Sequence, residues 1–487
     1  MTSRKFNVKL ACLKAAAVER EFDVNSVTFG GMQVWPLIRF MLYDQLTWGK
    51  GNFISTGEVW FNKFDYDRKF PEFSRSMAGT DILWLSNPEY YTDKIDGKYF
   101  CRFEDPFIEL FDKGNIKKIE LRTALSVERS DRLHKPHYFC PSVSVLRAPV
   151  EKLPEIKNFD EVAAVIKAVC GARIAREQLL EIALNVFSYF EYFLDMLQVI
   201  RPKAVFFACY YSRINMGLIR ACRHLGIPSV DYQHGKQGKF HGMYTHWTAI
   251  PPEGYELLPR YFWSWGEESA YNISRWMGDA GRMHQTLVGG SPWLYLWVNG
   301  MCSEDADVIR EFERLFSGKK TILVCLQRTE DGNVMLLDSM ISAMRDAPQD
   351  WCWLLRLPPA FRDRREVVVE KLKANGISNY EFDITNRASL YTLLKRVDHH
   401  VTTFSSVCYE ALSFGINTVV VHPIAKALYP EYIEKGYFIY AQTGEQIICS
   451  IKEGMEGDFI SEENPYIVSD IKSARKNIYF FLSQNKM

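Results

Sequence analysis

The chain has 487 residues, of which 47% are hydrophobic and 14% aromatic, enough for two or three domains with large cores. Lys plus Arg and Asp plus Glu both number 59, and the resulting zero net charge argues against nucleic acid as the main partner. Eleven scattered cysteines without a C-x-x-C pair fit reduced core residues and argue against a disulfide framework or a zinc site.

Helical patterns open the chain, and strands that end in polar turns follow them. Apolar residues at helical spacing predict helices within residues 1–50 and a long helical region over 159–200. The rest of the first half reads as strands at 81–86, 203–208, 227–233, 261–265 and 285–288, with helices at about 214–226 and 268–278. The strand at 227–233 ends in the turn His234-Gly235, so one βαβ unit carries a histidine at its strand tip.

The second half repeats this alternation after a Gly- and Pro-rich joint near 289–300. Strands are predicted at 321–327, 351–357, 380–382, 400–403 and 418–421, and helices at 335–344, 362–376, 389–396 and 468–482. Two such halves predict an α/β protein with two Rossmann-like domains facing each other across a cleft. We expect domains at 1–288 and 289–465, and a C-terminal helix within 466–487 that crosses back to the first domain or rests on a membrane surface.

The stretch 398–423 is the most informative part of the second half. A short strand leads into Ser405 and Ser406, a short helix, Gly415 and a second strand. Serine is a good N-cap and glycine often follows a helix end, so this is a βαβ unit. A polar turn that enters a helix favours anions, which makes the serine pair a candidate phosphate site. Glu410, one turn later, is a candidate acceptor for a ribose hydroxyl. Serine pairs of this kind are also ordinary helix caps.

These motifs resemble those of GT-B glycosyltransferases, above all bacterial capsule and O-antigen enzymes such as Kdo transferases, polysialyltransferases and polyglycerophosphate transferases. The resemblance covers roughly residues 200–425 and rests on the order of QHG, a Trp-Gly strand end, GSPW, an R-x-P strand end and the segment TTFSSVCYEALSFG. It implies that the first domain binds the acceptor and the second the nucleotide sugar. Thr403, Ser405 and Ser406 would then lie at the donor phosphate, with Glu410 near the ribose.

The same resemblance bears on the nucleotide. CMP-sialic-acid transferases carry an acidic-Asp-Gly motif, which residues 330–332 match. This match implies that Glu330 and Asp331 contact the acceptor or the base, although Asp-Gly is also an ordinary turn. The His-Pro motif of these enzymes is missing from the corresponding strand end, which reads Leu-Pro-Pro at 357–359, while a His-Pro pair occurs at a later strand end, at 422–423. Arg356, directly before the Leu-Pro-Pro sequence, supplies a positive charge there.

His234 is the candidate general base. Its ordinary pKa near 6.5 suits proton abstraction at neutral pH, and it lies on the domain to which the resemblance assigns the acceptor. Asp231, three residues earlier on the same strand, is a candidate to orient His234 or to act as base or nucleophile itself. The alternatives are a structural histidine and a solvated strand-end carboxylate.

Four tryptophans and two Asp-x-Asp strings complete the set of candidates. Aromatic residues at strand spacing are more often core than sugar-stacking platforms, and this applies to Trp263, Trp265, Trp293 and Trp297. The Asp-x-Asp strings, at 65–67 and 305–307, do not lie at predicted strand ends, so we expect no metal site.

Together these observations predict a cytoplasmic, metal-independent glycosyltransferase. It would move a sugar from an activated nucleotide, foremost a CMP-activated acidic sugar such as Kdo or a sialic-acid-like sugar, onto a bacterial surface polysaccharide or lipid-linked glycan. The nucleotide sugar is a substrate, and no separate cofactor is expected. A CDP-alditol-dependent polyol-phosphate transferase and a non-catalytic glycan-binding or scaffold protein remain alternatives. Neither a signal-peptide h-region nor a window of about 18 apolar residues occurs, and the final helix leaves peripheral contact with the inner face of the cell membrane open.

Overall fold

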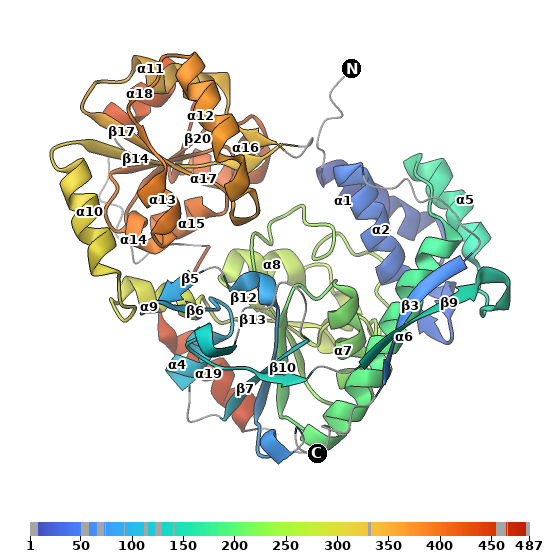
Figure 1. Cartoon of the computed structure of the whole chain (residues 1–487). Helices are drawn as coiled ribbons and strands as arrows, with labels where there is room; N and C mark the ends of the chain where they lie inside the picture. The colour runs from blue at the N-terminus through green and yellow to red at the C-terminus, as the bar shows by residue number, and fades with distance from the viewer. Residues whose placement is uncertain are drawn as a thin grey trace.

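Two parallel β-sheets, each flanked by helices, form two lobes that face each other in the computed structural model (Figure 1). The structure describes residues 8–49, 58–65, 73, 75–91, 93–111, 115–121, 129–139, 142–329, 333–453, 464 and 466–483. We call the part built on the first sheet the first lobe and the part built on the second sheet the second lobe. The predicted fold class, two facing Rossmann-like domains, is confirmed.

The first sheet is parallel throughout. Within the described residues its seven strands are, in spatial order, β13 (Gln285–Val288), β12 (Tyr261–Ser264), β11 (Ser229–Tyr232), β10 (Ala204–Ala208), β4 (Ile82–Ser86), β7 (Ile116–Leu121) and β8 (His137–Phe139). The central strands read as unbroken apolar runs because helices cover both of their faces. This is why the sequence revealed them.

The second sheet is parallel as well. Its six strands in the described part of the chain are, in spatial order, β18 (Tyr380–Glu381), β17 (Trp351–Arg356), β14 (Lys320–Cys325), β19 (His399–Thr402), β20 (Asn417–Val420) and β21 (Phe438–Tyr440). Short antiparallel pairs lie outside the two sheets: β1 (Thr28–Phe29) with β2 (Met32–Gln33), β3 (Glu58–Asp65) with β9 (Ser142–Pro149), β5 (Asp93–Ile95) with β6 (Lys98–Phe100), and β15 (Gln327–Arg328) with β16 (Val334–Met335).

Helices connect and cover the strands of both lobes. Those of the first lobe are α1 (Val8–Glu21), α2 (Trp35–Trp48), α4 (Asp105–Phe111), α5 (Phe159–Cys170), α6 (Arg176–Ile200), α7 (Arg213–His224) and α8 (Glu267–Ser274). The joint and the second lobe contain α9 (Pro292–Val298), α10 (Ala306–Phe316), α11 (Asp338–Asp346), α12 (Arg365–Ala374), α13 (Asp383–Arg387), α14 (Leu390–Leu394), α15 (Val407–Leu412), α16 (Ile424–Leu428), α17 (Pro430–Glu434), α18 (Gly444–Glu453) and α19 (Ile471–Leu482). Short 3₁₀ turns occur at Val24–Ser26, Pro88–Tyr90, Arg129–Asp131, Val150–Lys152, Gly278–Arg282 and Pro359–Arg364.

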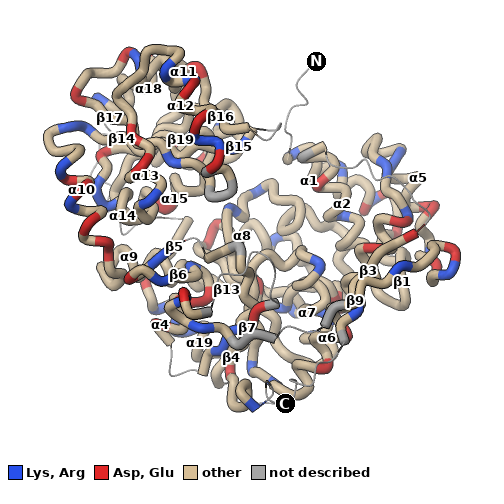
Figure 2. The backbone as a smooth tube through the Cα atoms, in the orientation of Figure 1, with Lys and Arg blue, Asp and Glu red and all other residues tan. Residues whose placement is uncertain are grey.

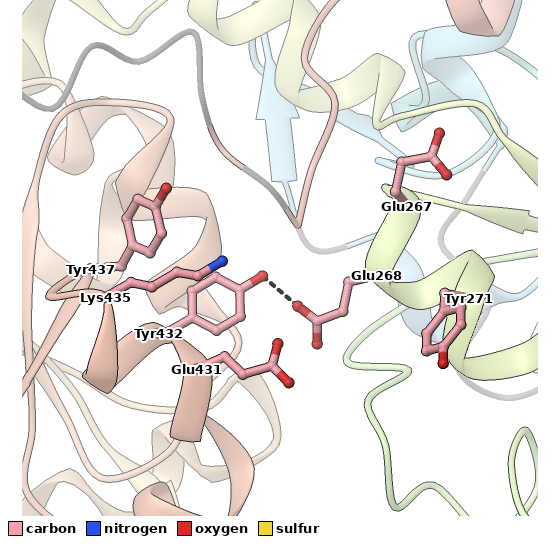
Figure 3. Close-up of a pocket in the computed structure, with 7 residues that line it drawn as sticks. All are labelled: Glu267, Glu268, Tyr271, Glu431, Tyr432, Lys435 and Tyr437. Atoms are coloured by element: carbon pink, nitrogen blue, oxygen red, sulfur yellow. Dashed lines mark hydrogen bonds between the residues drawn. The ribbon is translucent and has the colours of Figure 1, made fainter.

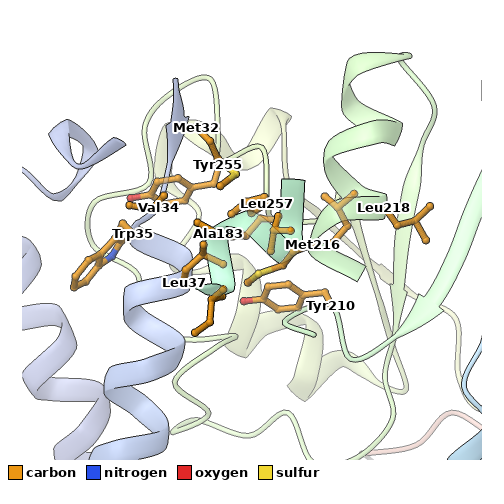
Figure 4. Close-up of a cluster of buried hydrophobic side chains, with 14 of the residues drawn as sticks. Met32, Val34, Trp35, Leu37, Ala183, Tyr210, Met216, Leu218, Tyr255 and Leu257 are labelled. Carbon is orange, nitrogen blue, oxygen red and sulfur yellow. The ribbon is translucent and has the colours of Figure 1, made fainter. Parts of the chain in front are cut away.

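Alternate residues of a strand pack into the apolar cores on opposite faces of the sheet, as β10 shows. Val205 and Phe207 of β10 join the core with α2, α6 and α7, part of which Figure 4 shows. Ala204 and Phe206 join the opposite core, which continues through α4, α9 and α19 to one face of the second sheet. The period of two along a strand therefore places the first sheet between two apolar layers, and one of these layers connects the lobes.

The region predicted as one long helical stretch is two helices. α5 ends at Gly171, whose φ of 67° is a left-handed conformation that glycine adopts without strain, and whose N–H donates to the carbonyl of Lys167. α6 begins at Arg176 and packs against α7. The chain therefore turns back over the first sheet and does not continue as a single rod.

The final helix, α19, lies against the first lobe. In Figure 1 it is the red helix beside α4. Phe481 packs edge-to-face on Phe206 and Tyr261, and Asn477 Nδ2 donates to the carbonyl of Val288 at 2.9 Å. The chain thus crosses between the lobes twice, once through α9 and α10 and once before α19.

Charges of both signs are interspersed over both lobes (Figure 2), in keeping with the zero net charge. Within the described ranges, no helix combines the length and the apolar character needed to cross a lipid bilayer.

A buried ion pair fixes the N-terminal helices to the segment that follows the histidine turn. Glu19 and Arg39 are paired and inaccessible to solvent. Arg39 also donates to the carbonyls of Gly242 at 2.9 Å and Thr245 at 2.8 Å, and Glu19 accepts from the N–H of Thr248. Every polar group of the pair therefore has a partner, which is the condition under which buried charges are tolerated.

Replacing Arg39 with methionine is expected to lower the free energy of unfolding by about 3–5 kcal/mol, because Glu19 is left buried without its countercharge. Urea unfolding followed by circular dichroism measures this change. The double variant Glu19→Leu/Arg39→Met should recover part of the loss. Arg345→Gln, in an exposed pair with Asp346, should leave the stability nearly unchanged. A single variant as stable as the wild type would contradict the prediction.

Candidate functional site

The serine turn lies at the carboxyl end of the second sheet, between β19 and β20. The βαβ unit predicted from the sequence is confirmed, with Gly415 in the left-handed conformation after α15. Ser405 is buried, and its Oγ accepts from the N–H of Val407 at 3.4 Å, so it acts as a local cap. Thr403 is also inaccessible, and its hydroxyl has no partner among the described residues.

Ser406 and Glu410 lie on the side of α15 that faces the first lobe, where both line a cavity. Ser406 is half-buried, and its side chain caps no backbone N–H. Glu410 is buried and accepts a short hydrogen bond from the hydroxyl of Tyr391 on α14. Burial raises the pKa of Glu410, although the positive charge of Arg102 opposes this effect. Of the predicted donor residues, Ser406 and Glu410 are therefore the two on the cavity wall.

His234 forms part of the opposite wall. It follows β11 at the carboxyl edge of the first sheet, and its Nε2 lies 3.5 Å from the hydroxyl of Tyr211. Its Nδ1 is buried and has no hydrogen-bond partner among the described residues. Burial lowers the pKa of His234 to about 4, and the nearby charge of Arg102 adds to this effect. The ring is therefore neutral at physiological pH and carries one nitrogen lone pair that can accept a proton.

Asp231 lies beneath the sheet edge and makes no hydrogen bond to His234. It is fully buried, and its carboxyl oxygens accept from the hydroxyl of Tyr244 at 2.8 Å and the N–H of Tyr210 at 3.1 Å. Burial raises the pKa of Asp231 to about 8. These contacts tie Asp231 to the segment after the histidine turn. The orienting contact considered from the sequence is not formed, because the carboxyl group is directed to the core.

The two walls enclose a small space that we call the interlobe cavity. It is lined by Arg102, Phe103, Tyr232, His234, Trp265, Ser291, Trp293, Tyr391, Ser406 and Glu410. Its volume is about 30 Å³, enough for one small group and too little for a nucleotide sugar. In this closed arrangement, the candidate residues His234 of the first lobe and Ser406 and Glu410 of the second lobe line one cavity.

Arg102 is a cavity residue that the sequence did not indicate. It lies in the loop between β6 and α4 and presents its guanidinium group without a hydrogen bond or ion pair to any other described residue. Burial acts to lower the pKa of Arg102, but Glu410 together with the neighbouring Tyr391, Asp93 and Cys101 outweighs this effect, and the pKa is raised. Arg102 and Glu410 therefore interact across the two lobes. Arg102 follows the short strand β6, which the sequence analysis did not predict, so no local signal set this residue apart.

The four tryptophans divide between core and cavity. Trp263 and Trp297 are buried in the core. Trp265 and Trp293 are buried too, but both line the interlobe cavity. Trp293 Nε1 has no hydrogen-bond partner in the described part of the chain. An indole N–H is only a donor, so this atom requires an acceptor.

Arg356 lies elsewhere. It ends β17, and its Nη1 donates to the carbonyls of Thr385 at 2.6 Å and Ala388 at 2.9 Å. It lines a second cavity, of about 470 Å³, between the β5–β6 hairpin and the α13–α14 region. The structure thus does not bring Arg356 to the cavity that contains Ser406.

Glu330 and Asp331 lie outside the described residues. No cluster of three or more His, Cys, Asp or Glu side chains suited to a metal ion occurs among the residues that the structure describes.

Lys236 joins the histidine turn to the second lobe. Its ammonium group donates to the carbonyl of Leu428 and lies 3.8 Å from the centroid of the Tyr429 ring. Tyr429 in turn donates to the carbonyl of Ser405 at 3.2 Å. Burial lowers the pKa of Lys236 to about 7, against the opposing effect of Cys408. The turns that carry His234 and Ser405 are therefore held together in the closed arrangement.

A third cavity, of about 360 Å³, lies between α8 and α17 (Figure 3). It is lined by Glu267, Glu268, Tyr271, Glu431, Tyr432, Lys435 and Tyr437. Tyr432 donates to Glu268 at 2.6 Å, which adds another contact between the lobes. None of the residues predicted from the sequence lines this cavity.

Comparison with solved structures supports the architecture. A Listeria monocytogenes protein assigned as a UDP-N-acetylglucosamine 2-epimerase superposes with a TM-score of 0.52 at 13% identity, over 84% of this chain and 98% of that one. The UDP-GlcNAc 2-epimerase of Methanocaldococcus jannaschii gives 0.51 at 13% identity, over 82% and 99%. HepE of Anabaena, solved with UDP and glucose, gives 0.46 at 11% identity, over 83% and 100%.

Sequence comparison adds no relative. No family model matches the chain, and no curated protein is detectably similar to it. At these identities the structural likeness concerns the fold, and two of the superpositions exceed a TM-score of 0.5. The chain has the GT-B-like fold, which it shares with enzymes that use nucleotide sugars.

Proposed function

We propose that this protein is a metal-independent glycosyltransferase whose reaction takes place in the interlobe cavity. The observation that carries the proposal is that one cavity is lined by His234 from the first lobe and by Ser406 and Glu410 from the second. In GT-B-like folds ligands bind beyond the carboxyl ends of the strands, and both walls are built from such ends. Residues 1–288 would bind the acceptor and 289–465 the donor.

In the proposed reaction, an acceptor hydroxyl oxygen attacks the anomeric carbon of the donor. The hydroxyl proton passes to the neutral ring of His234, and the nucleotide leaves with the electron pair of the broken carbon–oxygen bond on its phosphate. The hydroxyl of Ser406 stabilises the negative charge that develops on this phosphate. Since the closed cavity holds only one small group, the lobes must separate for donor and acceptor to enter.

We propose a CMP-activated acidic sugar, such as Kdo or a sialic-acid-like sugar, as the donor, and a surface polysaccharide or lipid-linked glycan as the acceptor. The Glu-Asp-Gly sequence at 330–332 supports the nucleotide. A CDP-alditol-dependent transferase would use the same cavity, and product mass separates the two, because a phosphodiester link adds a phosphate. A non-catalytic glycan-binding or scaffold protein would transfer nothing.

The fold likeness favours a second candidate, epimerisation of a UDP-sugar, since two of the similar structures are described as UDP-GlcNAc 2-epimerases. An epimerase converts its nucleotide sugar without an acceptor, whereas a transferase releases nucleotide only when an acceptor is present. Incubation of each nucleotide sugar with and without a glycan acceptor, followed by mass spectrometry, distinguishes the two activities.

Isothermal titration with CMP, CDP, UDP, GDP and dTDP tests the donor site. We expect one nucleotide to bind in the millimolar range or tighter, and Ser406→Ala/Glu410→Gln to weaken that binding about tenfold or more, because two polar contacts are lost. The control Ser450→Ala/Glu445→Gln removes the same groups from α18, which does not line the cavity. Equal binding by both double variants would place the donor elsewhere.

A further inference from the structure

The interlobe cavity contains hydrogen-bond donors that nothing in the described protein satisfies. Arg102 presents a guanidinium group without a hydrogen bond or ion pair to another described residue. Trp293 is 2% exposed, and its Nε1 has no partner. The hydroxyl of Ser406 caps no backbone group. A buried donor without an acceptor costs free energy, so these groups imply a missing acceptor.

We propose that Arg102 and Trp293 bind an oxyanion of the donor, either a carboxylate on its sugar or a phosphate of its nucleotide. The planar guanidinium fork matches both groups, and an indole N–H supplies a further donor that cannot itself accept. The proposal rests on the proposed function only in that it takes the anion to belong to a nucleotide sugar. It assigns a binding role to two side chains that the motifs leave without one.

The loop that carries Arg102 is held in place from beneath by buried ionic groups. Asp105 accepts from the N–H of Cys101 at 2.8 Å and forms an ion pair with Lys118. Glu104 accepts from the hydroxyl of Ser86 at 2.7 Å, at the carboxyl end of β4. Buried charges are costly and contribute little to net stability. Here they fix Cys101 and Glu104, on either side of the half-buried Arg102, which is the arrangement that a preorganised anion site requires.

Glu410 is compatible with such an anion. Its carboxyl group already accepts from Tyr391, and burial raises its pKa, so its repulsion of a second anion is reduced. The competing interpretation is that Arg102 serves only as a structural countercharge to Glu410 across the lobes. The two interpretations differ in what the loss of Arg102 does: the first weakens ligand binding, and the second weakens contact between the lobes.

Tryptophan fluorescence titration of the full chain tests the proposal, because Trp265 and Trp293 line the cavity. The probes are CMP-N-acetylneuraminate, CMP, UDP-N-acetylglucosamine, inorganic phosphate and glucuronate. We expect Arg102→Gln to weaken anion binding about a hundredfold and Arg102→Lys to weaken it less, since lysine keeps the charge without the fork. Trp293→Phe keeps the ring and removes the N–H, and should weaken binding about tenfold. Lys98→Gln, an exposed cation on β6, is the matched control and should bind like the wild type.

The pattern over the probes identifies the anion. If Arg102→Gln weakens the binding of CMP-N-acetylneuraminate and glucuronate alone, the bound anion is a carboxylate. If it weakens the binding of every phosphate-containing probe equally, the bound anion is a phosphate. Nucleotide sugars that bind equally to Arg102→Gln and Trp293→Phe overturn the anion site and leave the proposed function standing. Binding of phosphate or glucuronate that depends on Arg102, with no nucleotide bound, overturns the proposed function and leaves the anion site. If no probe binds the wild type, both are overturned. Thermal melts of each variant confirm that it is folded.

Discussion

Replacing His234 with glutamine is expected to reduce turnover about 10²- to 10⁴-fold and to leave the Kd for the nucleotide nearly unchanged. The reason is that His234 belongs to the wall formed by the first lobe, whereas Ser406 and Glu410 belong to the second. Glutamine is similar in size and hydrogen-bonding capacity but cannot take up a proton at neutral pH. Initial rates with donor and acceptor, together with calorimetric titration of the nucleotide, measure both quantities.

The pH dependence of the reaction follows from the environment of His234. Its pKa is lowered to about 4 by burial and by Arg102, so the neutral base is present above pH 4 and is lost as the pH falls through that value. Removal of the Arg102 charge by Arg102→Gln should therefore move this acid limb to higher pH. NMR titration of the imidazole protons reports the same shift without turnover.

An anion bound to Arg102 acts on His234 in the same direction. It offsets the positive charge that lowers the pKa of His234, and so makes the ring a stronger base when the donor is present. His422→Gln is the matched control, because His422 lies in the turn after β20 and does not line the cavity. A His234→Gln variant with wild-type turnover would exclude His234 as the general base, whatever the binding data show.

The second large effect expected is a steep loss of stability in acid. Burial lowers the pKa of His234, His246 and His284 to about 4 and that of His241 and His400 to about 3. The ordinary pKa of histidine is near 6.5. At pH values between the lowered pKa and 6.5, the unfolded chain therefore binds protons that the folded chain does not bind. The contribution of these histidines to the free energy of unfolding is therefore complete above about pH 6.5, and it falls as the pH drops toward 4.

The size of this effect is about 1.4 kcal/mol per pH unit for each fully buried histidine, or about 2–3 kcal/mol per site at pH 4.5. His400 is the best single reporter, because it is inaccessible and, among the described residues, its one hydrogen bond joins Nδ1 to the hydroxyl of Thr418 at 3.0 Å. Urea unfolding at pH 7.0, 6.0, 5.0 and 4.5 measures the slope. His400→Leu should reduce the slope by the contribution of one histidine, about 1.4 kcal/mol per pH unit. His224 is an exposed histidine at the end of α7, and His224→Gln should leave the slope unchanged.

Asp231 acts in the opposite direction. Burial raises its pKa to about 8, so the folded state binds a proton that the unfolded state releases near pH 4, and this contribution is lost as the pH rises toward 8. Maximum stability is therefore expected near neutral pH. A free energy of unfolding that stays constant between pH 7.0 and 4.5 would contradict the assignment of these histidines as buried and neutral.

The sequence predicted the fold well because its signals are local. Strands buried on both faces appear as continuous apolar runs, such as 204–208 and 351–356, and they can be read without knowledge of their neighbours. The turn at Ser405 and Ser406 could be predicted for the same reason, because the cap, the short helix and Gly415 lie close together in the chain. The break at Gly171 was missed, because the apolar pattern continues on both sides of it.

The candidate site was only partly predictable. His234 and Ser406 each follow a strand, Glu410 lies on the helix that begins after Ser406, and the structure brings these three to one cavity. Arg356 ends a strand, but its side chain donates to the carbonyls of Thr385 and Ala388. The direction of a side chain at a strand end depends on what packs around it, and a strand-end pattern does not contain that information.

By itself the sequence determined two sets of parallel strands, the helices between them and the polar turns at their carboxyl ends, because each follows from the order of apolar and polar residues within a few turns of chain. Only the tertiary structure decided that Arg102 and Trp293 meet His234 and Ser406 in one cavity, and that Asp231 is turned away from it. These residues are separated by up to about three hundred positions, and packing of the lobes alone sets which side chains meet and how far burial shifts their pKa values.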